Sequence, residues 1–312
     1  MIKYYITSPS EKILKEISTP QKGCWIHSES PEPEEIARIS ALTDIPESFM
    51  RSALDEEETA HVDTHGSARM VIIDIPKMIE NGGSAAISTM PLALIQNDNY
   101  IVSICTMHTS VLDDFFQGKI KNAETAQRSK LIYQIMYNSS SRFLYYLRQI
   151  DKTSDRIQKS LAKSMQNKEL LQLLELQKSL VFFSASLTAN YAVVQKISNN
   201  NLSKATDEER DILEDVVIEN KQAIEMCSVY REIIKNTMDA FASVVNNNMN
   251  IVMKFLTAIT IILSIPIVIA GFWGMNTGVP FEGQLWGFWA ATGISVLISV
   301  IIVIFMARKK MF

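Results

Sequence analysis

Short apolar runs and polar turns alternate over the first 110 or so residues of the chain. The runs are KYYIT, CWIH, MVIIDIP, MPLALIQ and YIVSICT, and their length and composition are typical of β-strands. Asn97, Asp98 and Asn99 join the last two runs and favour a hairpin turn. The stretch SPEPEEIARISALTDI, which opens with Ser, Pro and acidic residues, predicts a helix between strands. This part of the chain therefore predicts an α/β domain.

The strand pattern ends near residue 120, and helical signals replace it. Leu, Gln, Lys and Glu dominate from there, with candidate helices over about residues 123–164 and 168–198. The segment SNNNLSKA, residues 198–205, predicts a polar loop after the second helix.

A long helix is predicted to begin after this loop. Thr206 and Glu209 have the T-x-x-E spacing of a capping box, in which two side chains satisfy free backbone amides of the first turn. Apolar residues then recur three or four positions apart, and neither Pro nor Gly occurs before Pro266. The helix is therefore expected over about residues 207–273, which is on the order of 100 Å at the standard rise per residue.

Two apolar segments near the C-terminus have the length of membrane spans. Residues 255–273 and 286–306 contain no charged side chain, and about 20 apolar residues are enough for a helix to cross a bilayer. Trp273, Trp286 and Trp289 lie at the facing ends of the two segments, as an interfacial aromatic belt would. Both segments are therefore predicted to be transmembrane helices.

Charge at the span ends predicts the orientation. Lys254 precedes the first span, and the tail containing Arg308, Lys309 and Lys310 follows the second, whereas the connecting loop has no Lys or Arg. Because positive charge stays on the cytoplasmic side, both termini are expected in the cytoplasm. The N-terminus lacks the apolar core of a secretory signal.

The cysteine count agrees with a reducing compartment. Cys24, Cys105 and Cys227 are widely separated and lack metal-site spacing, so they are expected to be reduced and mostly buried. The net charge of −4 indicates no particular partner, and no nucleic-acid partner is expected.

One narrow sector of the long helix carries a mostly polar stripe that crosses the predicted membrane boundary. Helical spacing places its members above one another; they are Asp239, Asn246, Asn250, Met253, Thr257, Thr260 and Ser264. In an isolated span such hydroxyls would bond to their own backbone or assist helix packing. A continuous polar line that starts at an acid favours a wet cation pathway instead.

Such a pathway would need several copies of the chain, because two spans cannot surround a pore. Met253 interrupts the polar line and Leu256 lies at its edge, so rings of these side chains would form a hydrophobic constriction that gates by dewetting. Gly274, Met275 and Asn276 follow the first span and would place a ring of carboxamides at the outer mouth. Mg2+ releases its water reluctantly, so carboxamide oxygens suit the hydrated ion.

At these residues the sequence resembles the CorA family of divalent cation transporters. The resemblance rests on GMN at residues 274–276, on NIVMKFLT upstream and on the basic tail ARKKMF, and it extends to GCWIH, PEEI, SALDEEETAHVD and RMVIIDIP in the α/β part. It implies a funnel-shaped homopentamer in the plasma (inner) membrane. It also implies Mg2+ influx driven by the membrane potential and closure when cytoplasmic Mg2+ binds between subunits.

The resemblance also implies roles for single residues. Asn276 matches the outer selectivity ring, Met253 and Leu256 match the gate, and Asn250 matches a polar ring beside it. Asp239 matches an acidic ring in the stalk, which is the part of the long helix before the membrane.

The regulatory site that the resemblance implies is altered in this chain. Asp215 matches one half of it. Ser52 stands where the other regulatory carboxylate is expected, with Asp55 and Glu56 close by as replacements. An exposed helix end explains that acidic run equally well.

Ion identity follows less directly from the resemblance. The loop TGVPFEGQ lacks the Met-Pro-Glu-Leu common in the family, Trp273 replaces a Tyr, and the glycine and proline after GMN are similar to the ZntB branch, which carries Zn2+. The CorA resemblance makes Mg2+ the first expectation, and these departures keep Zn2+, Co2+ or Ni2+ as alternatives. His61, Asp63 and His65 form an H-x-D-x-H string that would suit Zn2+ or lie in an exposed loop, whereas His27 and His108 are interpreted as structural.

The predicted organisation has six parts. They are residues 1–120, a cytoplasmic α/β domain; 121–205, a cytoplasmic helical hairpin; 206–273, a stalk helix that continues into the first span at about 255–273; 274–285, an extracellular loop with GMN; 286–306, the second span; and 307–312, a basic cytoplasmic tail. No P-loop, HExxH, GxSxG or dinucleotide motif is present, so an enzyme is not expected and transport should be passive. A membrane-anchored coiled-coil sensor without a pore is the alternative of another class.

Overall fold

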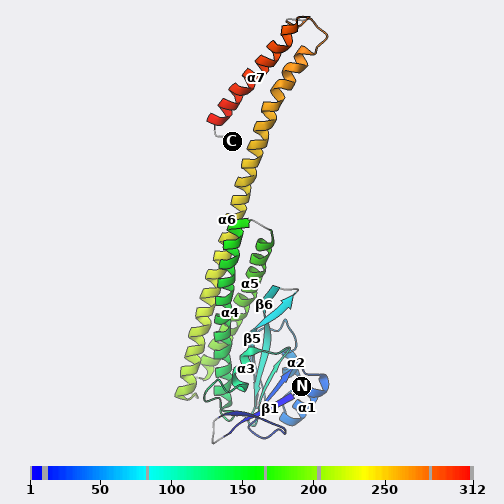
Figure 1. Cartoon of the computed structure of the whole chain (residues 1–312). Helices are drawn as coiled ribbons and strands as arrows, with labels where there is room; N and C mark the ends of the chain where they lie inside the picture. The colour runs from blue at the N-terminus through cyan, green and yellow to red at the C-terminus, as the bar shows by residue number, and fades with distance from the viewer. Residues whose placement is uncertain are drawn as a thin grey trace. The chain divides into compact units, whose positions relative to one another are not determined.

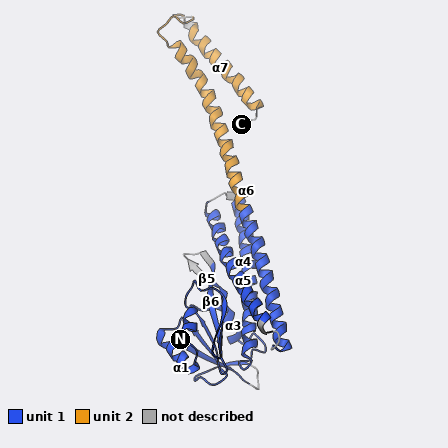
Figure 2. Cartoon of the chain, turned by 180° about the vertical axis from the view of Figure 1, so that it is seen from behind, with its two compact units in different colours: residues 1–236 blue, residues 237–312 orange. Residues whose placement is uncertain are grey.

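The structure is a computed structural model that describes residues 2–8, 13–81, 84–164, 167–201, 205–280 and 283–309. The chain forms two compact units, Met1–Asn236 and Thr237–Phe312, whose boundary lies inside the longest helix (Figures 1 and 2). Glu282 of the connecting loop, Lys310 of the basic tail and residues 202–204 of the predicted polar loop lie outside the described residues.

The first unit is built on a seven-stranded sheet. Its strands are β1 (Ile2–Thr7), β2 (Leu14–Ile17), β3 (Trp25–Glu29), β4 (His61–His65), β5 (Ala68–Asn81), β6 (Ser84–Gln96) and β7 (Ile101–Cys105). Their spatial order is β2-β1-β3-β7-β6-β5-β4. Strands β3 and β7 pair in parallel, and the other neighbouring strands pair antiparallel.

Alternating side chains of the strands supply two separate hydrophobic cores. Along β5, Val71, Ile73 and Ile75 belong to one core, and Met70 and Ile72 belong to the other. This follows from the period of two in a strand, which sends successive side chains to opposite faces. The sheet is therefore covered by helices on both faces.

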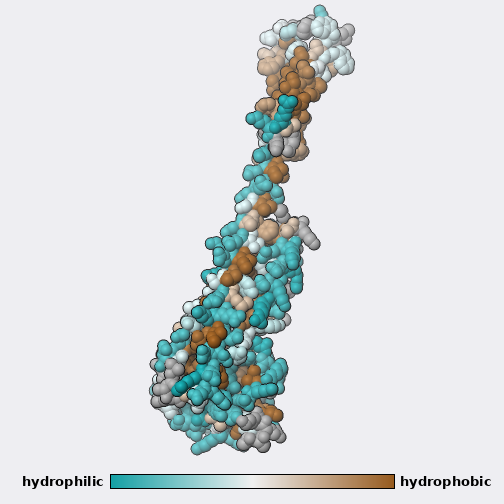
Figure 3. All heavy atoms as spheres, turned by 90° about the vertical axis from the view of Figure 1, so that its left-hand side faces the viewer, coloured by the Kyte–Doolittle hydropathy of each residue, from teal (hydrophilic) through white to brown (hydrophobic). Residues whose placement is uncertain are grey.

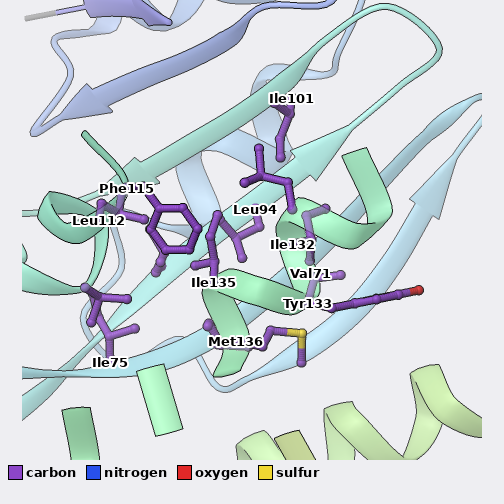
Figure 4. Close-up of a cluster of buried hydrophobic side chains, with 14 of the residues drawn as sticks. Val71, Ile75, Leu94, Ile101, Leu112, Phe115, Ile132, Tyr133, Ile135 and Met136 are labelled. Atoms are coloured by element: carbon purple, nitrogen blue, oxygen red, sulfur yellow. The ribbon is translucent and has the colours of Figure 1, made fainter. Parts of the chain in front are cut away.

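Helices from different parts of the chain cover the two faces. Helices α1 (Pro33–Thr43) and α2 (Glu47–Ser52) complete the core that contains Ile72. Helix α3 (Ser110–Phe116) and parts of three longer helices complete the core that contains Val71. Figure 4 shows side chains of the sheet, of α3 and of residues 132–136 of one longer helix gathered there. The α/β prediction is thereby confirmed.

Sequence reasoning located the β6–β7 hairpin but missed the weaker elements. The Oδ1 atom of Asn97 accepts hydrogen bonds from the backbone amides of Asn99, at 3.0 Å, and Tyr100, at 2.8 Å, so the turn prediction is confirmed. Strands β2 and β4 were not predicted as strands because they form the two edges of the sheet and bury few side chains. Helices α2 and α3 have 6 and 7 residues, which is too short for a periodic signal.

Two long helices follow the sheet. They are α4 (Arg128–Ser164) and α5 (Asn167–Asn201). The rings of Phe143 and Phe183 meet edge to face at 4.8 Å, and the thiol of Cys227 donates to the Leu180 carbonyl at 3.2 Å. All three cysteines are free and buried, which confirms the expected burial.

The predicted polar loop after α5 begins later than expected. Ser198 to Asn201 still belong to α5, so the prediction of a loop from residue 198 was wrong. Asparagine lowers helix propensity only slightly when the preceding turns are already packed, and Val193, Val194 and Ile197 are buried in the core.

Helix α6 (Asp207–Trp273) begins and ends where the sequence predicted. The Thr206 amide donates to Glu209 Oε2 at 2.9 Å, and the Glu209 amide donates to Thr206 Oγ1 at 3.3 Å. These reciprocal bonds confirm the capping box.

The second unit holds the end of α6 and helix α7 (Leu285–Arg308), which are long and apolar enough to cross a membrane. Only 6% of the most apolar window of α6 and 11% of that of α7 are buried, unlike the core helix of a soluble protein. Hydrophobic residues dominate these two helices on the face drawn in Figure 3. Surfaces this apolar need lipid or further protein around them.

Candidate functional site

The predicted stripe lies on an exposed face of α6. Its members from Asp239 to Ser264 are all exposed in the single chain, and so is Leu256 beside them. The side chains of α6 that are buried or half-buried in the same segment include Ala258, Ile262 and Ile265, which lie on another sector of the helix. The stripe is therefore available for water or for another copy of the chain.

Ser264 is at the border of this face. It lines an apolar groove together with Ile261 and Ile265 of α6 and Ile298 of α7. The inner end of the stripe, at Asp239, is thus exposed, whereas its outer end, at Ser264, lies beside the second span.

The hydroxyl groups of the stripe bond to the backbone of their own helix. Thr257 donates to the Met253 carbonyl at 2.8 Å, Thr260 to the Leu256 carbonyl at 2.9 Å, and Ser264 to the Thr260 carbonyl at 2.7 Å. Each hydroxyl oxygen keeps lone pairs that can accept a hydrogen bond from water. In one chain the hydroxyls therefore need no partner, and they offer acceptors to whatever lies outside the helix.

Met253 and Leu256 pack against little within the chain. Their exposed fractions are 52% and 56%, although both are large apolar residues. Side chains whose role is core packing are rarely this exposed. Their partners must come from lipid or from other copies.

The GMN residues follow the last turn of α6. The Gly274 amide still donates to the Ala270 carbonyl at 2.9 Å, and the Met275 amide donates to the Phe272 carbonyl at 3.4 Å. A Cβ atom at residue 274 would lie 3.2 Å from the Ala270 oxygen, so glycine relieves crowding at this turn. Asn276 is exposed just beyond the helix end.

The acidic candidates fall into two groups. Asp239 and Asp215 are both exposed on α6. Glu56 already has a cationic partner, because Lys77 Nζ lies 3.1 Å from its Oε2 atom. Asp55 Oδ1 accepts the Glu57 amide at 3.0 Å, which closes a local turn.

The H-x-D-x-H string forms β4 and shows no metal-site geometry. His61 Nδ1 lies 2.8 Å from the Thr59 carbonyl and 3.5 Å from Glu58 Oε1, and the ring of His65 meets the Phe49 ring edge to face. Within the described part of the chain, no three His, Cys, Asp or Glu side chains converge closely enough to hold a metal ion.

A further feature of the spans was missed by sequence reasoning. The face of α7 that is buried or half-buried carries small residues four positions apart, and they are Gly287, Ala291, Ser295 and Ser299. Small residues at this spacing let two membrane helices approach closely. The spacing of these small residues was visible in the sequence. The sequence alone did not show which helix they would face.

Comparisons with known proteins match this arrangement along nearly the whole chain. The family model described as CorA-like Mg2+ transporter protein matches residues 20–309. The cobalt/magnesium transport protein CorA of Methanocaldococcus jannaschii is 26% identical over 91% of this chain and 90% of its own length. The cobalt/magnesium transport protein CorA of Thermotoga maritima is 24% identical over 58% of this chain and 52% of its own length.

Solved structures agree on the fold. The complete CorA magnesium transporter of Methanocaldococcus jannaschii has a TM-score of 0.87 at 24% identity, covering 100% of this chain and 99% of that one. The full-length CmaX protein has a TM-score of 0.72 at 16% identity, covering 98% and 96%. The ZntB cytoplasmic domain of Vibrio parahaemolyticus has a TM-score of 0.53 at 13% identity, covering 76% and 98%. The likeness is thus greater to the archaeal CorA structure than to the ZntB domain.

Proposed function

The chain belongs to the family of CorA-like Mg2+ transporter proteins, and from this premise we propose that it is a passive channel for hydrated divalent cations across the plasma membrane. Members of this family are transporters, not enzymes. The proposal adds the ion pathway, the gate and the filter, and assigns each to named residues.

The observation that carries the proposal is the placement of GMN directly after the helix that bears the exposed stripe. Helix α6 ends at Trp273, and the stripe runs along the same helix from Asp239 to Ser264. One unbroken helix would therefore connect an outer ring of Asn276 side chains to an acidic inner ring. A pore needs such continuity, whereas an anchor or signalling helix does not.

The polar members of the stripe would carry the ion with its water shell. Mg2+ keeps several of its waters in protein sites, and the oxygens of Asn246, Asn250, Thr257, Thr260 and Ser264 are acceptors for those waters. Asp239 would concentrate cations at the inner end. Gly274 and Met275 shape the turn that holds Asn276 at the outer end.

The gate is assigned to Met253 and Leu256. Their exposure in the single chain is explained if rings of both side chains meet at the axis of an oligomer. A narrow apolar ring closes by expelling water, so it blocks a hydrated ion without a charged barrier.

A homopentamer is the assembly proposed for this chain, with both termini in the cytoplasm. The two spans expose nearly all of their apolar windows, so one copy cannot enclose a path. The number five comes from the resemblance to the family.

Regulation by cytoplasmic Mg2+ is proposed at the contact between copies. Asp215 of one copy and Asp55 of the next would supply carboxylate ligands. Glu56 is the weaker candidate, because a cation there would have to displace Lys77.

Mg2+ is proposed as the main ion, with Co2+ as a second substrate. Cobalt and magnesium appear in the names of both similar CorA proteins. Ni2+ and Zn2+ remain competing ions to be measured beside them.

The test is uptake into liposomes that contain the purified full-length protein, with an inside-negative potential and Mg2+, Co2+, Ni2+ or Zn2+ outside. Asn276→Ala is expected to reduce Mg2+ and Co2+ uptake to the level of protein-free liposomes, because the ring contributes ion contact and little packing. Thr277→Ala is the matched control, since this neighbouring side chain is also exposed, and it should retain uptake.

Three results would change the proposal. Normal uptake by a correctly assembled Asn276→Ala variant would remove the filter assignment. Zn2+ uptake with little Mg2+ uptake would assign the chain a ZntB-like specificity. No uptake of any cation by the wild-type oligomer would contradict the channel and favour the anchored sensor.

A further inference from the structure

A cluster of histidines and carboxylates lies where the end of β3 meets the start of α3. Strands β3 and β7 are parallel there, with Glu29 opposite Cys105, and the Ser30 amide donates to the Cys105 carbonyl at 2.8 Å. His108 lies in the short link between β7 and α3. None of these residues belongs to the proposed ion pathway.

A buried chain of hydrogen bonds reaches Glu29 from the inner side of the cluster. Trp25 Nε1 donates to Ser103 Oγ at 2.8 Å, and His27 Nδ1 lies 2.8 Å from the same oxygen. His27 Nε2 lies 3.2 Å from Glu29 Oε1, and since a carboxylate only accepts, Nε2 donates this hydrogen bond. Glu29 is therefore the acceptor at the end of this chain.

The outer side of the cluster is a histidine between two carboxylates. His108 Nδ1 lies 3.0 Å from Glu29 Oε1, and His108 Nε2 lies 2.9 Å from Asp113 Oδ2. A neutral imidazole has one N–H and would turn a lone pair toward one of the carboxylates. Both contacts are hydrogen bonds only when the ring is an imidazolium.

The contacts add to ring packing between β3 and α3, where Trp25 meets Phe115 with ring centroids 5.9 Å apart. Glu29 ends β3, and Asp113 belongs to the first turn of α3. Thr109, the N-cap of α3, accepts the Val111 amide at 3.2 Å. His108 therefore ties the capped start of the helix to the sheet.

We propose that His108, in its doubly protonated form, is a proton-sensitive latch that holds the start of α3 against the end of β3. Loss of one proton removes one of the two hydrogen bonds and leaves a lone pair facing a carboxylate, which loosens residues 106–117. The side chain of His108 is 65% exposed, so its proton exchanges freely with the solution.

The electrostatic environment also favours the protonated form of His108. The hydrogen bond from His27, opposed by burial and helped by His108, lowers the pKa of Glu29 to about 2, so its carboxylate is charged at every relevant pH. The hydrogen bond with Glu29 raises the pKa of His108 above its ordinary value of 6.5, against the smaller effect of burial. The stabilisation from His108 is thus complete below its ordinary pKa and is lost as the pH rises through the raised value.

Two other titratable groups around the latch, Tyr5 and Cys105, stay neutral in this window. Burial raises the pKa of Tyr5 on β1 to about 12, with Glu16, Glu29 and Asp113 adding to the effect. Burial likewise raises the pKa of Cys105 on β7 to about 12, with a smaller effect of Glu29. Stability from Glu29 is lost as the pH falls from the ordinary pKa of 4.5 toward about 2, which lies below this window. His27 also contacts Glu29, so the variant His108→Gln is what assigns the response to His108.

Hydrogen exchange of the full-length protein in detergent, followed by mass spectrometry from about pH 5.5 to about pH 8.5, tests the latch. After correction for the intrinsic exchange rate, protection of residues 106–117 should fall roughly two- to fivefold as the pH rises, the range expected for an exposed ion pair. His108→Gln should lower protection at low pH and abolish this pH dependence. His65→Gln, which changes an exposed histidine outside the cluster, should behave as wild type.

A second variant keeps the test decidable if His108→Gln does not fold. Asp113→Asn keeps a polar side chain but removes one of the two charges beside His108, so the midpoint of the transition should move to lower pH. Protection of the wild-type segment that does not depend on pH, or an unchanged midpoint in Asp113→Asn, would overturn the latch.

Discussion

Met253 and Leu256 are apolar side chains in a line that is otherwise polar, and the chain itself leaves them more than half exposed. Asn250 and Thr257 lie one helical turn below and above Met253. Water could therefore approach the methionine ring from both sides, and the side chain alone would set the barrier. The proposed gate therefore depends on the bulk of the Met253 side chain.

Replacing Met253 with glycine should raise Mg2+ uptake. The substitution widens and wets the constriction, while a glycine in a helix interior costs about 1 kcal/mol relative to alanine. Initial uptake rates in liposomes, normalised to the amount of assembled protein, measure the effect. Ile251→Gly is the control, because this isoleucine is 54% exposed but lies on the opposite side of the helix from Met253.

Equal or lower uptake by an assembled Met253→Gly variant would mean that this side chain serves packing between copies. A rise in both variants would point to general loosening of the helix, because only Met253 belongs to the line through Asp239 and Thr257.

At the scale of elements, α6 combines two surfaces on one helix. Its buried or half-buried residues between Ala258 and Ile269 form one sector, and the stripe forms another. The hydroxyl protons of Thr257, Thr260 and Ser264 are used inside the helix, so these residues cost little to place in an apolar segment. Their oxygens can still hydrate the outer surface.

Thr260→Val should therefore lower ion flux while leaving the fold intact. The two side chains have nearly the same shape, but valine removes the oxygen that accepts a hydrogen bond from water. Thr292→Val on α7 is the matched control, because Thr292 makes the same bond, to the Phe288 carbonyl at 2.9 Å. Flux assays on both variants, with oligomer yield as the check on folding, separate the roles; equal flux in the two would argue against a wet stripe.

An element could be predicted from the sequence when the interactions that stabilise it join residues close together in the chain. The capping box at Thr206 and the turn at Asn97 are satisfied within a few residues, so the sequence located both. Edge strands β2 and β4 bury few side chains and owe their existence to pairing with a neighbour, which no local pattern reveals.

The candidate site shows the same division. The stripe and GMN lie on one helix and its end, so helical spacing was sufficient to group them. The Glu56–Lys77 pair joins a loop to β5, and the contacts of His108 join β3 to α3; both are long-range and were invisible before folding.

At the scale of the whole molecule, the proposed pathway is incomplete in one chain. The apolar windows of the two spans are 6% and 11% buried, and the stripe faces away from the packed sector of α6. A closed ring of copies resolves both facts, because the stripes then face one axis and the remaining apolar surface faces lipid.

Purified full-length protein in mild detergent should accordingly have the mass of five chains, and oxidation should link Thr257→Cys in neighbouring copies. The native cysteines do not interfere, because all three are buried. Val300→Cys, on an exposed face of α7, is the control and should remain unlinked. Cross-linking at residue 300 but not at residue 257 would mean that α7 lines the axis. That outcome would remove the physical basis for assigning the pore to the stripe, since the hydroxyl groups of α6 would then face lipid, where a wet surface has no stabilising partner.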